Sequence, residues 1–223
     1  MDTKREDQNI EEEAKDYILL IMNCKKYRAK AMMQKKTWLR NIPPALRYYH
    51  VMGDPELTAD FMFDEAEHIL YVKTPDDYVS LPKKVICAYE AVEKTCHYKY
   101  ILKTDDDQTL TNMKFMDMVI GITSKASPRF HYGGYIVNVE QNYYSKYHTI
   151  HPELPKDLPV LITKYCNGRF YFLSDEAIRD LLKKKKKISA EYLEDYAIGL
   201  HLDKSMKENV LNLQTHLFLK DII

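Results

Sequence analysis

The stretch YILKTDDD, residues 100–107, ends a short run of β-forming residues in three consecutive carboxylates. From residue 98 to 103, Tyr98, Tyr100 and Leu102 alternate with Lys99, Ile101 and Lys103. This alternation, in a run dominated by β-forming residues, predicts a β-strand. Three adjacent negative charges repel one another and resist burial unless a cation neutralises them. Because open α/β sheets bind ligands at the carboxyl ends of their strands, the triplet predicts a divalent metal site. A solvated acidic turn is the alternative for such a triplet in isolation.

Strand and helix patterns alternate along the first half of the chain. Further strands are predicted over residues 17–22, 46–52, 69–72, 130–139 and 170–173, the fourth of them broken by Gly133 and Gly134. Helices are predicted over residues 25–40, 81–96, 112–120, 174–187 and 192–204, with a short helical turn over 61–66 and a β-like tail over 210–219. This order predicts an α/β domain over residues 17–223, with a mostly parallel sheet between helices. Residues 1–16 are polar and predict a flexible lead-in.

Composition excludes several classes of protein. Lys+Arg and Asp+Glu are balanced at 33 each, so no overall field favours nucleic acid or an anionic membrane. No apolar stretch approaches the ~20 residues of a membrane span, and the first residues lack the apolar core of a secretory signal. The four cysteines show no CxxC spacing, which argues against structural zinc. Free thiols are expected, with up to two disulfides as the alternative.

A second acidic pair, Glu194-Asp195, stands at the start of a predicted helix, where the helix dipole favours an ionised carboxylate. Simple capping of that helix is the alternative. His216 lies in the apolar tail, where a histidine is usually a core residue with satisfied nitrogens. Two carboxylates and an imidazole together would nevertheless suit Mn²⁺, which accepts oxygen and nitrogen ligands.

Residues 140–164 are loop-rich and aromatic. They include Tyr143, Tyr144, Tyr147 and His148, together with three prolines. A long loop of this kind inside a compact domain predicts a binding segment.

In order along the chain, these motifs resemble the β1,3-galactosyltransferase and fringe-like family of inverting, metal-dependent glycosyltransferases that use nucleotide sugars. The resemblance runs from about residue 17 to 220 and rests on six segments: KKTW at 35–38, DDYVSLPK at 76–83, YILKTDDD at 100–107, KYCNG at 164–168, FLS at 172–174 and EDYAIG at 194–199. No single segment is specific, but their order and spacing are. The resemblance implies one domain of the GT-A fold, with a nucleotide-binding half and an acceptor-binding half.

The resemblance also implies roles for particular residues. Asp107, with Asp105 and His216, would hold Mn²⁺ or Mg²⁺, and His201 is a second candidate for the histidine ligand. Lys103, Asp105 and Asp106 would lie beside the ribose and diphosphate of a UDP-sugar. Asp195 matches the catalytic base of the family.

Further residues are expected in the donor or acceptor pocket: Asn167, Gly168, Arg169, Glu194, Gly134 and Trp38. For Trp38, packing in the core is the stronger interpretation. Arg169 stands where the family usually has small residues, so it narrows the pocket or adds a positive charge. The resemblance further implies a disulfide between Cys96 and Cys166.

The expected activity is transfer of a hexose or N-acetylhexosamine (Gal, GlcNAc or Glc) from a UDP-sugar to a hydroxyl of a glycan or glycoprotein acceptor, with a β1,3 linkage. Two alternatives are an inactive nucleotide-sugar-binding or glycan-binding protein of the same fold, and a metal-dependent nucleotidyl transferase. The family resemblance implies the Golgi lumen for a truncated member, and a soluble cytoplasmic enzyme, such as a viral one acting in a host cell, otherwise.

Overall fold

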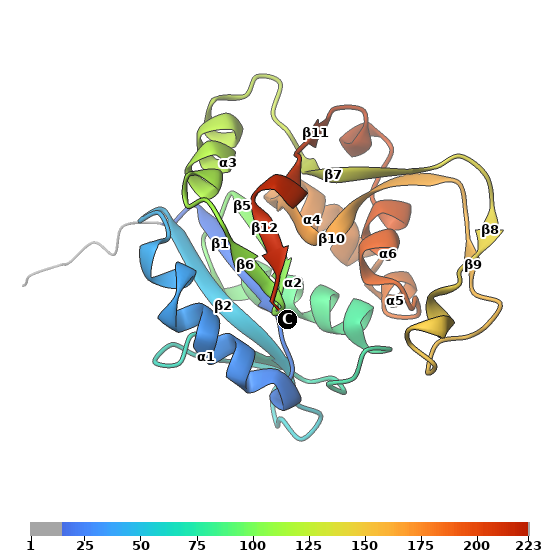
Figure 1. Ribbon diagram of the computed structural model, residues 1–223, viewed down its shortest axis with the longest axis horizontal. Helices are drawn as coiled ribbons and strands as arrows, with labels where there is room; N and C mark the ends of the chain where they lie inside the picture. Colours follow the sequence, from blue (N-terminus) through green and yellow to red (C-terminus); the bar gives the residue numbers. More distant parts are fainter. Residues whose placement is uncertain (1–14, 223) are drawn as a thin grey trace, which may run out of the picture.

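The computed structural model describes residues 15–222, so most of the predicted lead-in over 1–16 lies outside the described residues. An eight-stranded sheet runs through the molecule in the order β11-β7-β10-β5-β1-β2-β4-β3 (Figure 1). Its strands are β1 (Tyr17–Met22), β2 (Leu46–Gly53), β3 (Phe61–Asp64), β4 (Ile69–Val72), β5 (Tyr100–Asp105), β7 (Tyr132–Val139), β10 (Thr163–Ser174) and β11 (Val210–Asn212). Two small sheets pair β6 (Gln108–Leu110) with β12 (Leu219–Asp221) and β8 (Tyr143–Tyr144) with β9 (Pro159–Val160).

The helices are α1 (Arg28–Lys36), α2 (Leu81–Thr95), α3 (Lys114–Lys125), α4 (Asp175–Lys183), α5 (Lys185–Ile188) and α6 (Glu194–His201). Short 3₁₀ turns occur at η1 (Lys25–Tyr27), η2 (Trp38–Asn41), η3 (Tyr147–Thr149), η4 (Ser205–Lys207) and η5 (Thr215–Leu217). Ser174 caps α4 as its sequence predicts, because its side chain accepts a hydrogen bond from the Ala177 N–H.

The central sheet is mostly parallel, as predicted. Strand β1 pairs in parallel with β2 and β5, and β2 pairs in parallel with β4. Strand β10 is antiparallel to both β5 and β7, so β7 and β11 point the same way as β5, and β3 is the other reversed strand. The carboxyl ends of β1 and β5 therefore meet at one edge, where Met22 lies opposite Asp105.

Apolar layers cover both faces of this sheet. In β1, Ile18, Leu20 and Met22 belong to the core under α2, α4 and α6, whereas Tyr17 and Leu19 belong to the core under η2 and α3. A continuous apolar strand is what burial on both faces requires. Each such side chain contributes about 1.5–3 kcal/mol when it is fully buried. The sheet edge that carries the acidic triplet is thus fixed by packing on both sides.

Three predicted elements differ from the structure. Residues 61–66 form no helical turn, because β3 pairs antiparallel with β4 through a turn in which His68 has a φ of 50°. Strand β7 continues through Gly133 and Gly134 without a break. A Cβ on Gly133 would lie 2.4 Å from the Phe172 ring, so the glycines permit close contact with β10. The predicted tail strand is divided into β11, η5 and β12.

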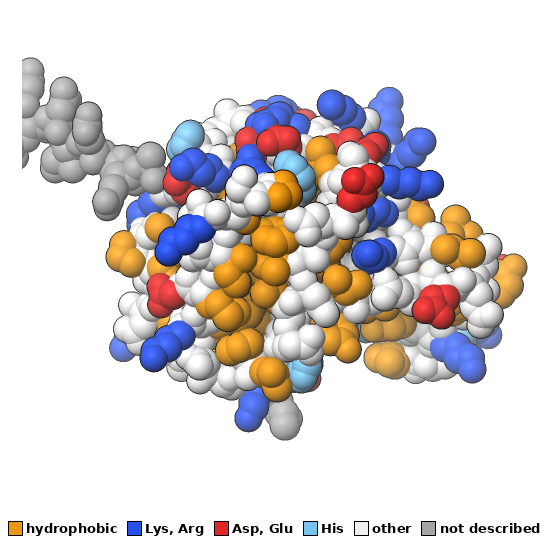
Figure 2. Space-filling model, turned by 90° about the horizontal axis from the view of Figure 1, so that it is seen from above, with side chains coloured by type: hydrophobic (Ala, Val, Ile, Leu, Met, Phe, Trp, Pro, Cys, Tyr) orange, Lys and Arg blue, Asp and Glu red, His pale blue; other side chains and the backbone are white. Residues whose placement is uncertain are grey.

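The loop-rich segment around β8 and β9 forms an arm at one side of the molecule (Figure 1). Its exposed hydrophobic residues are Tyr143, Tyr144, Tyr147, Ile150, Leu161 and Ile162. Hydrophobic side chains show on this arm at the right of Figure 2, apart from the apolar band across the middle of that face. Strong exposure of aromatic residues in one segment is typical of a binding surface.

All four cysteines are free thiols, which agrees with the expectation from the sequence and contradicts the implied disulfide between Cys96 and Cys166. Cys166 is buried, and burial raises the pKa of its thiol to about 12. A thiol of this kind is unreactive. Among the described residues, none of the helices is both long and apolar enough to span a membrane.

Candidate active site

A cavity of about 580 Å³ opens where the carboxyl ends of β1 and β5 meet. Most of the residues predicted to form the site line it: Lys103, Asp105, Asp106, Asp107, Asn167, Gly168, Arg169, Glu194 and Asp195. These residues come from three elements that are far apart in sequence, namely the end of β5, the middle of β10 and the start of α6. The fold therefore brings the two acidic motifs to one pocket.

An irregularity in β10 shapes one wall of this pocket. The pairing of β10 with β7 shifts register between Cys166 and Tyr171, which bulges the strand at residues 167–169. Thr104 fixes the bulge by donating from Oγ1 to the Arg169 carbonyl at 2.7 Å. A Cβ on Gly168 would lie 3.4 Å from both Asp195 Oδ2 and Lys103 Nζ. A methyl group here would therefore make ordinary van der Waals contact with two charged groups of the site.

Lys103 lies at the centre of the site and is only 1% exposed. Its ammonium group contacts Asp105 Oδ1 at 2.7 Å, Glu194 Oε2 at 2.8 Å and the Gly168 carbonyl at 2.9 Å. Burial alone would lower the pKa of Lys103, but attraction to the Asp105 and Glu194 carboxylates raises it overall. All three N–H donors of Lys103 are therefore directed at protein oxygens, and its expected contact with a nucleotide stays a prediction.

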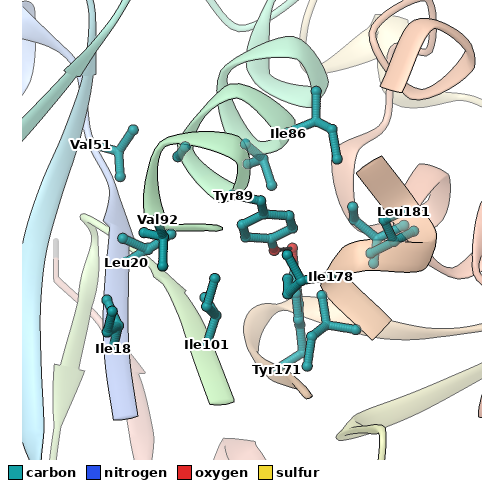
Figure 3. Close-up of a cluster of buried hydrophobic side chains, with 14 of the residues drawn as sticks. Ile18, Leu20, Val51, Ile86, Tyr89, Val92, Ile101, Tyr171, Ile178 and Leu181 are labelled. Atoms are coloured by element: carbon teal, nitrogen blue, oxygen red, sulfur yellow. Dashed lines mark hydrogen bonds between the residues drawn. The ribbon is translucent and has the colours of Figure 1, made fainter. Parts of the chain in front are cut away.

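Glu194 extends this network into the core. Its Oε1 accepts a hydrogen bond from the Tyr171 hydroxyl, which in turn lies 2.7 Å from the Tyr89 hydroxyl. Figure 3 shows the Tyr89 ring of α2 and the Tyr171 side chain of β10 meeting at their hydroxyl groups within the hydrophobic cluster. Burial raises the pKa of Glu194. Buried polar groups need hydrogen-bond partners, and both Glu194 oxygens have one. We therefore interpret Glu194 as a residue that supports the structure of the site.

The acidic triplet follows β5 into the pocket, as predicted. The Asp106 N–H donates to the Met22 carbonyl at 3.0 Å, and its carboxylate lies 3.5 Å from Lys30 Nζ. Asp107 Oδ1 accepts a hydrogen bond from Gln108 Nε2 at 2.9 Å. Burial raises the pKa of Asp105 and that of Asp106 to about 6 each. Both carboxylates are thus costly to ionise here without a further cation.

These raised pKa values predict how stability depends on pH. Between the unperturbed value of 3.8 and about 6, the folded protein binds more protons at Asp106 than the unfolded chain does. The free energy of unfolding of the metal-free protein should therefore fall as pH rises through this window. Urea unfolding at several pH values in EDTA measures this slope. We expect Asp106→Asn to flatten it, and equal slopes for the two proteins would contradict the prediction.

Asp195 faces the triplet's pocket from the first turn of α6. Its Oδ2 accepts a hydrogen bond from the Gly168 N–H at 2.8 Å, and its Oδ1 accepts one from the Tyr196 N–H at 2.8 Å. Burial raises the pKa of Asp195, although Lys103 and both backbone N–H groups oppose the shift. The result is an oriented carboxylate whose pKa is moved toward neutrality, which is a property of general bases.

Four predicted positions do not reach the pocket. His216 is exposed and stacks edge-on against Tyr135, with ring centroids 5.7 Å apart. His201 Nε2 lies 2.9 Å from Glu191 Oε1 at the end of α6. Trp38 is buried in the core under η2, in line with the core interpretation. Gly134 is a packing glycine, because a Cβ there would lie 2.8 Å from the Phe170 carbonyl.

Sequence reasoning did not assign a role to Asp76, which organises the other wall. Its Oδ1 accepts from the Gly53 N–H at 2.7 Å and from Lys84 Nζ at 2.6 Å, and its Oδ2 accepts from the Lys25 N–H at 2.6 Å. One carboxylate thus joins the segment after β1 and the last residue of β2 to helix α2. The available signal was its place in the motif at residues 76–83.

Aromatic residues close the pocket on the side of the arm. The Tyr78 ring stacks on His151 at a centroid distance of 3.7 Å, and Tyr147 lies parallel to His151 at 6.3 Å. All three line the cavity. His151 was not predicted as a site residue, although it lies in the aromatic loop that was predicted to bind.

Metal binding can be judged from the charges of the pocket. Among the described residues, eight acidic side chains and four Lys or Arg side chains line it, so a phosphate would meet an excess of negative charge unless a cation is added. Within residues 15–222, no three His, Cys, Asp or Glu side chains are arranged to hold a metal ion alone. Mg²⁺ is usually held by one or two carboxylates together with substrate phosphates. Asp107 and Asp105 fit a divalent ion of that kind, and the expected third ligand, His216, is not brought to them.

Comparison with known proteins identifies the family of the chain. The family model for Galactosyltransferase matches residues 29–209. No curated protein matches the chain. A crystal structure of a glycosyltransferase involved in the glycosylation of the major capsid of PBCV-1 shares 12% identity over 78% of this chain and 65% of that chain, with a TM-score of 0.41. The glycosyltransferase GlyE in Streptococcus pneumoniae TIGR4 shares 10% identity over 92% of this chain and 46% of that chain, with a TM-score of 0.47.

The chain thus spans less than two thirds of the length of either solved structure. The family match covers far more than half of the chain and includes the triplet, the β10 bulge and the start of α6. It confirms the resemblance drawn from the motifs. The chain therefore belongs to the galactosyltransferase family.

Proposed function

We propose that the protein is an inverting, metal-dependent glycosyltransferase of the GT-A type that transfers a hexose or N-acetylhexosamine from a UDP-sugar to a hydroxyl of a glycan or glycoprotein, forming a β1,3 linkage. The observation that carries the proposal is the division of the pocket's acids. The triplet follows β5, whereas Asp195 is held separately by two backbone N–H groups. A displacement with inversion needs such a division, because the leaving group and the attacking hydroxyl lie on opposite faces of the sugar.

The triplet supports the donor side of this proposal. Asp107 and Asp105 are the residues that would hold Mn²⁺ or Mg²⁺, and the cavity of about 580 Å³ is within the usual size of small-molecule sites. A bound divalent ion supplies positive charge that stabilises the departing diphosphate. Asp106 would lie beside the diphosphate, and the Lys30 ammonium 3.5 Å from its carboxylate partly offsets its negative charge.

Asp195 supports the acceptor side. As the acceptor oxygen bonds to the anomeric carbon and the bond from that carbon to the diphosphate oxygen breaks, the hydroxyl proton passes to the Asp195 carboxylate. The Gly168 and Tyr196 N–H groups orient this carboxylate before the acceptor arrives. Its pKa, raised by burial, makes it a stronger base than an exposed aspartate.

The arm supports a carbohydrate acceptor. Tyr143 and Tyr147 line the pocket and are 49% and 48% exposed, so their rings are available to a ligand. Aromatic faces offer a large, rigid apolar surface next to a polar hydroxyl, which suits the mixed surface of a sugar. The acceptor would approach Asp195 along these rings.

The proposal is tested by product analysis with a panel of nucleotide sugars and glycan acceptors, each with and without Mn²⁺. We expect release of UDP, together with a metal-dependent glycosidic product of inverted anomeric configuration. Release of pyrophosphate would identify a nucleotidyl transferase instead. UDP-sugar binding without transfer or hydrolysis would identify a binding protein of the same fold.

A further inference from the structure

The pocket contains few cations that are free to meet a phosphate. Of its four basic side chains, Lys84 and Lys103 are 3% and 1% exposed and already contact protein oxygens. Lys84 donates to Asp76 and to the Asn23 carbonyl, and Lys103 contacts two carboxylates and a carbonyl. The other two, Lys30 and Arg169, are 31% and 27% exposed. Among the residues that the structure describes, an incoming anion can therefore recruit only Lys30 and Arg169 without breaking a buried network.

Arg169 is held by a contact that a ligand can replace. Its Nη2 lies 3.0 Å and 3.1 Å from the two carboxylate oxygens of Asp221, and its Nη1 donates to the Leu219 carbonyl at 3.3 Å. Both Asp221 oxygens thus share one nitrogen rather than matching the two-nitrogen fork of the guanidinium. The Asp221 side chain is 62% exposed, and exposed ion pairs contribute little stability.

Asp221 belongs to β12, which pairs with β6 directly after the acidic triplet. Gln108 Nε2 donates to Asp221 Oδ1 at 2.7 Å and to Asp107 Oδ1 at 2.9 Å. The Asp221 carboxylate therefore lies beside the triplet and lines the pocket. It is an anion placed between a guanidinium and an amide, which is also how proteins hold a phosphate oxygen.

We propose that Arg169 is a ligand of the donor's diphosphate, and that the Asp221 carboxylate occupies this guanidinium until the diphosphate displaces it. This inference rests on the proposed function for the identity of the nucleotide. A phosphate carries more charge and more acceptor oxygens than a carboxylate, and it can use the full fork of Arg169. Asp221 is then a competitor of the donor, and removing its charge should strengthen binding.

Calorimetric titration in excess Mn²⁺ tests this, with UDP and inorganic pyrophosphate as probes. We expect Asp221→Asn to tighten binding of both probes about two- to fivefold, the range that an exposed ion pair supplies. Arg169→Ala should weaken binding about tenfold or more, and Arg169→Lys should recover part of the loss. In the Arg169→Ala background, Asp221→Asn should have no effect. Asp117→Asn, the same change at an exposed site on α3, is the matched control for net charge.

Weaker or unchanged binding by Asp221→Asn would overturn the proposal, and weaker binding would make Asp221 a metal or ligand contact instead. The same gain in Asp117→Asn, or in the Arg169→Ala background, would also overturn it by showing a general charge effect. If the protein binds pyrophosphate but not UDP, the proposed donor is contradicted, and the Arg169 variants measured with pyrophosphate still decide the role of Arg169. Binding of neither probe would overturn both.

Discussion

Replacing Asp195 by Asn should lower kcat by about 10²- to 10⁴-fold, the usual contribution of a general base. The amide cannot accept the acceptor's proton, and in the proposed mechanism donor binding does not depend on Asp195. The wild-type pH profile should carry the same information, because burial raises the pKa of Asp195 above that of an ordinary aspartate. We expect kcat to fall as pH drops through this raised pKa. Initial rates across pH measure both effects.

Asp195→Asn also lowers stability, and the experiment must distinguish this loss of stability from a loss of catalysis. Both Asp195 oxygens accept backbone N–H groups, and an amide can satisfy only one of them. The unpaired donor is expected to cost about 1–3 kcal/mol of stability. Unfolding curves show whether the variant is folded at the assay temperature. A folded Asp195→Asn variant with near wild-type turnover would contradict the assignment of the base.

Lys103→Met should reduce the free energy of unfolding by about 3–5 kcal/mol, because it leaves carboxylates in the site without their cation. The Asp105 and Glu194 carboxylates both lie within 2.8 Å of the Lys103 ammonium, and Glu194 is 5% exposed. Removing one member of a buried ionic network is more costly than removing the whole network. Urea unfolding measures the loss.

Lys99→Met is the matched control, because Lys99 forms an exposed ion pair with Asp16 at 2.7 Å, just before β5. Exposed pairs are worth about 0–1 kcal/mol, so this variant should remain close to wild type. Equal stability of the two variants would show that Lys103 has no structural role. That result would instead favour the predicted role of Lys103 in binding the nucleotide.

The sequence predicted the central sheet well because its strands are the most strongly apolar segments. Strands β1 and β5 are buried on both faces, and a continuous apolar run of strand length is typical of such a position. The predicted helical turn at residues 61–66 failed because β3 is a short edge strand, and it is specified by pairing with β4 rather than by its own pattern.

The parts of the site that consist of one local sequence motif were predicted. The parts formed by contacts between residues far apart in the sequence were missed. The triplet and Asp195 were found because acidic residues at the end of a strand and at the start of a helix are local signals. The bulge at residues 167–169, the bonds of Asp76 and the stack of Tyr78 on His151 join segments up to 73 residues apart. Only the folded chain brings such partners together. His216 shows the reverse case, because its sequence position suggested a ligand that the fold leaves exposed.

In the proposed mechanism the two acidic motifs have separate roles: the triplet holds metal and nucleotide, and Asp195 takes the proton. Titration of UDP into Asp107→Asn and Asp195→Asn in the presence of Mn²⁺ tests this division most directly. We expect Asp107→Asn to lose most of its metal-dependent affinity for UDP, whereas Asp195→Asn should bind UDP within about twofold of wild type. Loss of UDP binding in Asp195→Asn, with normal binding in Asp107→Asn, would contradict it.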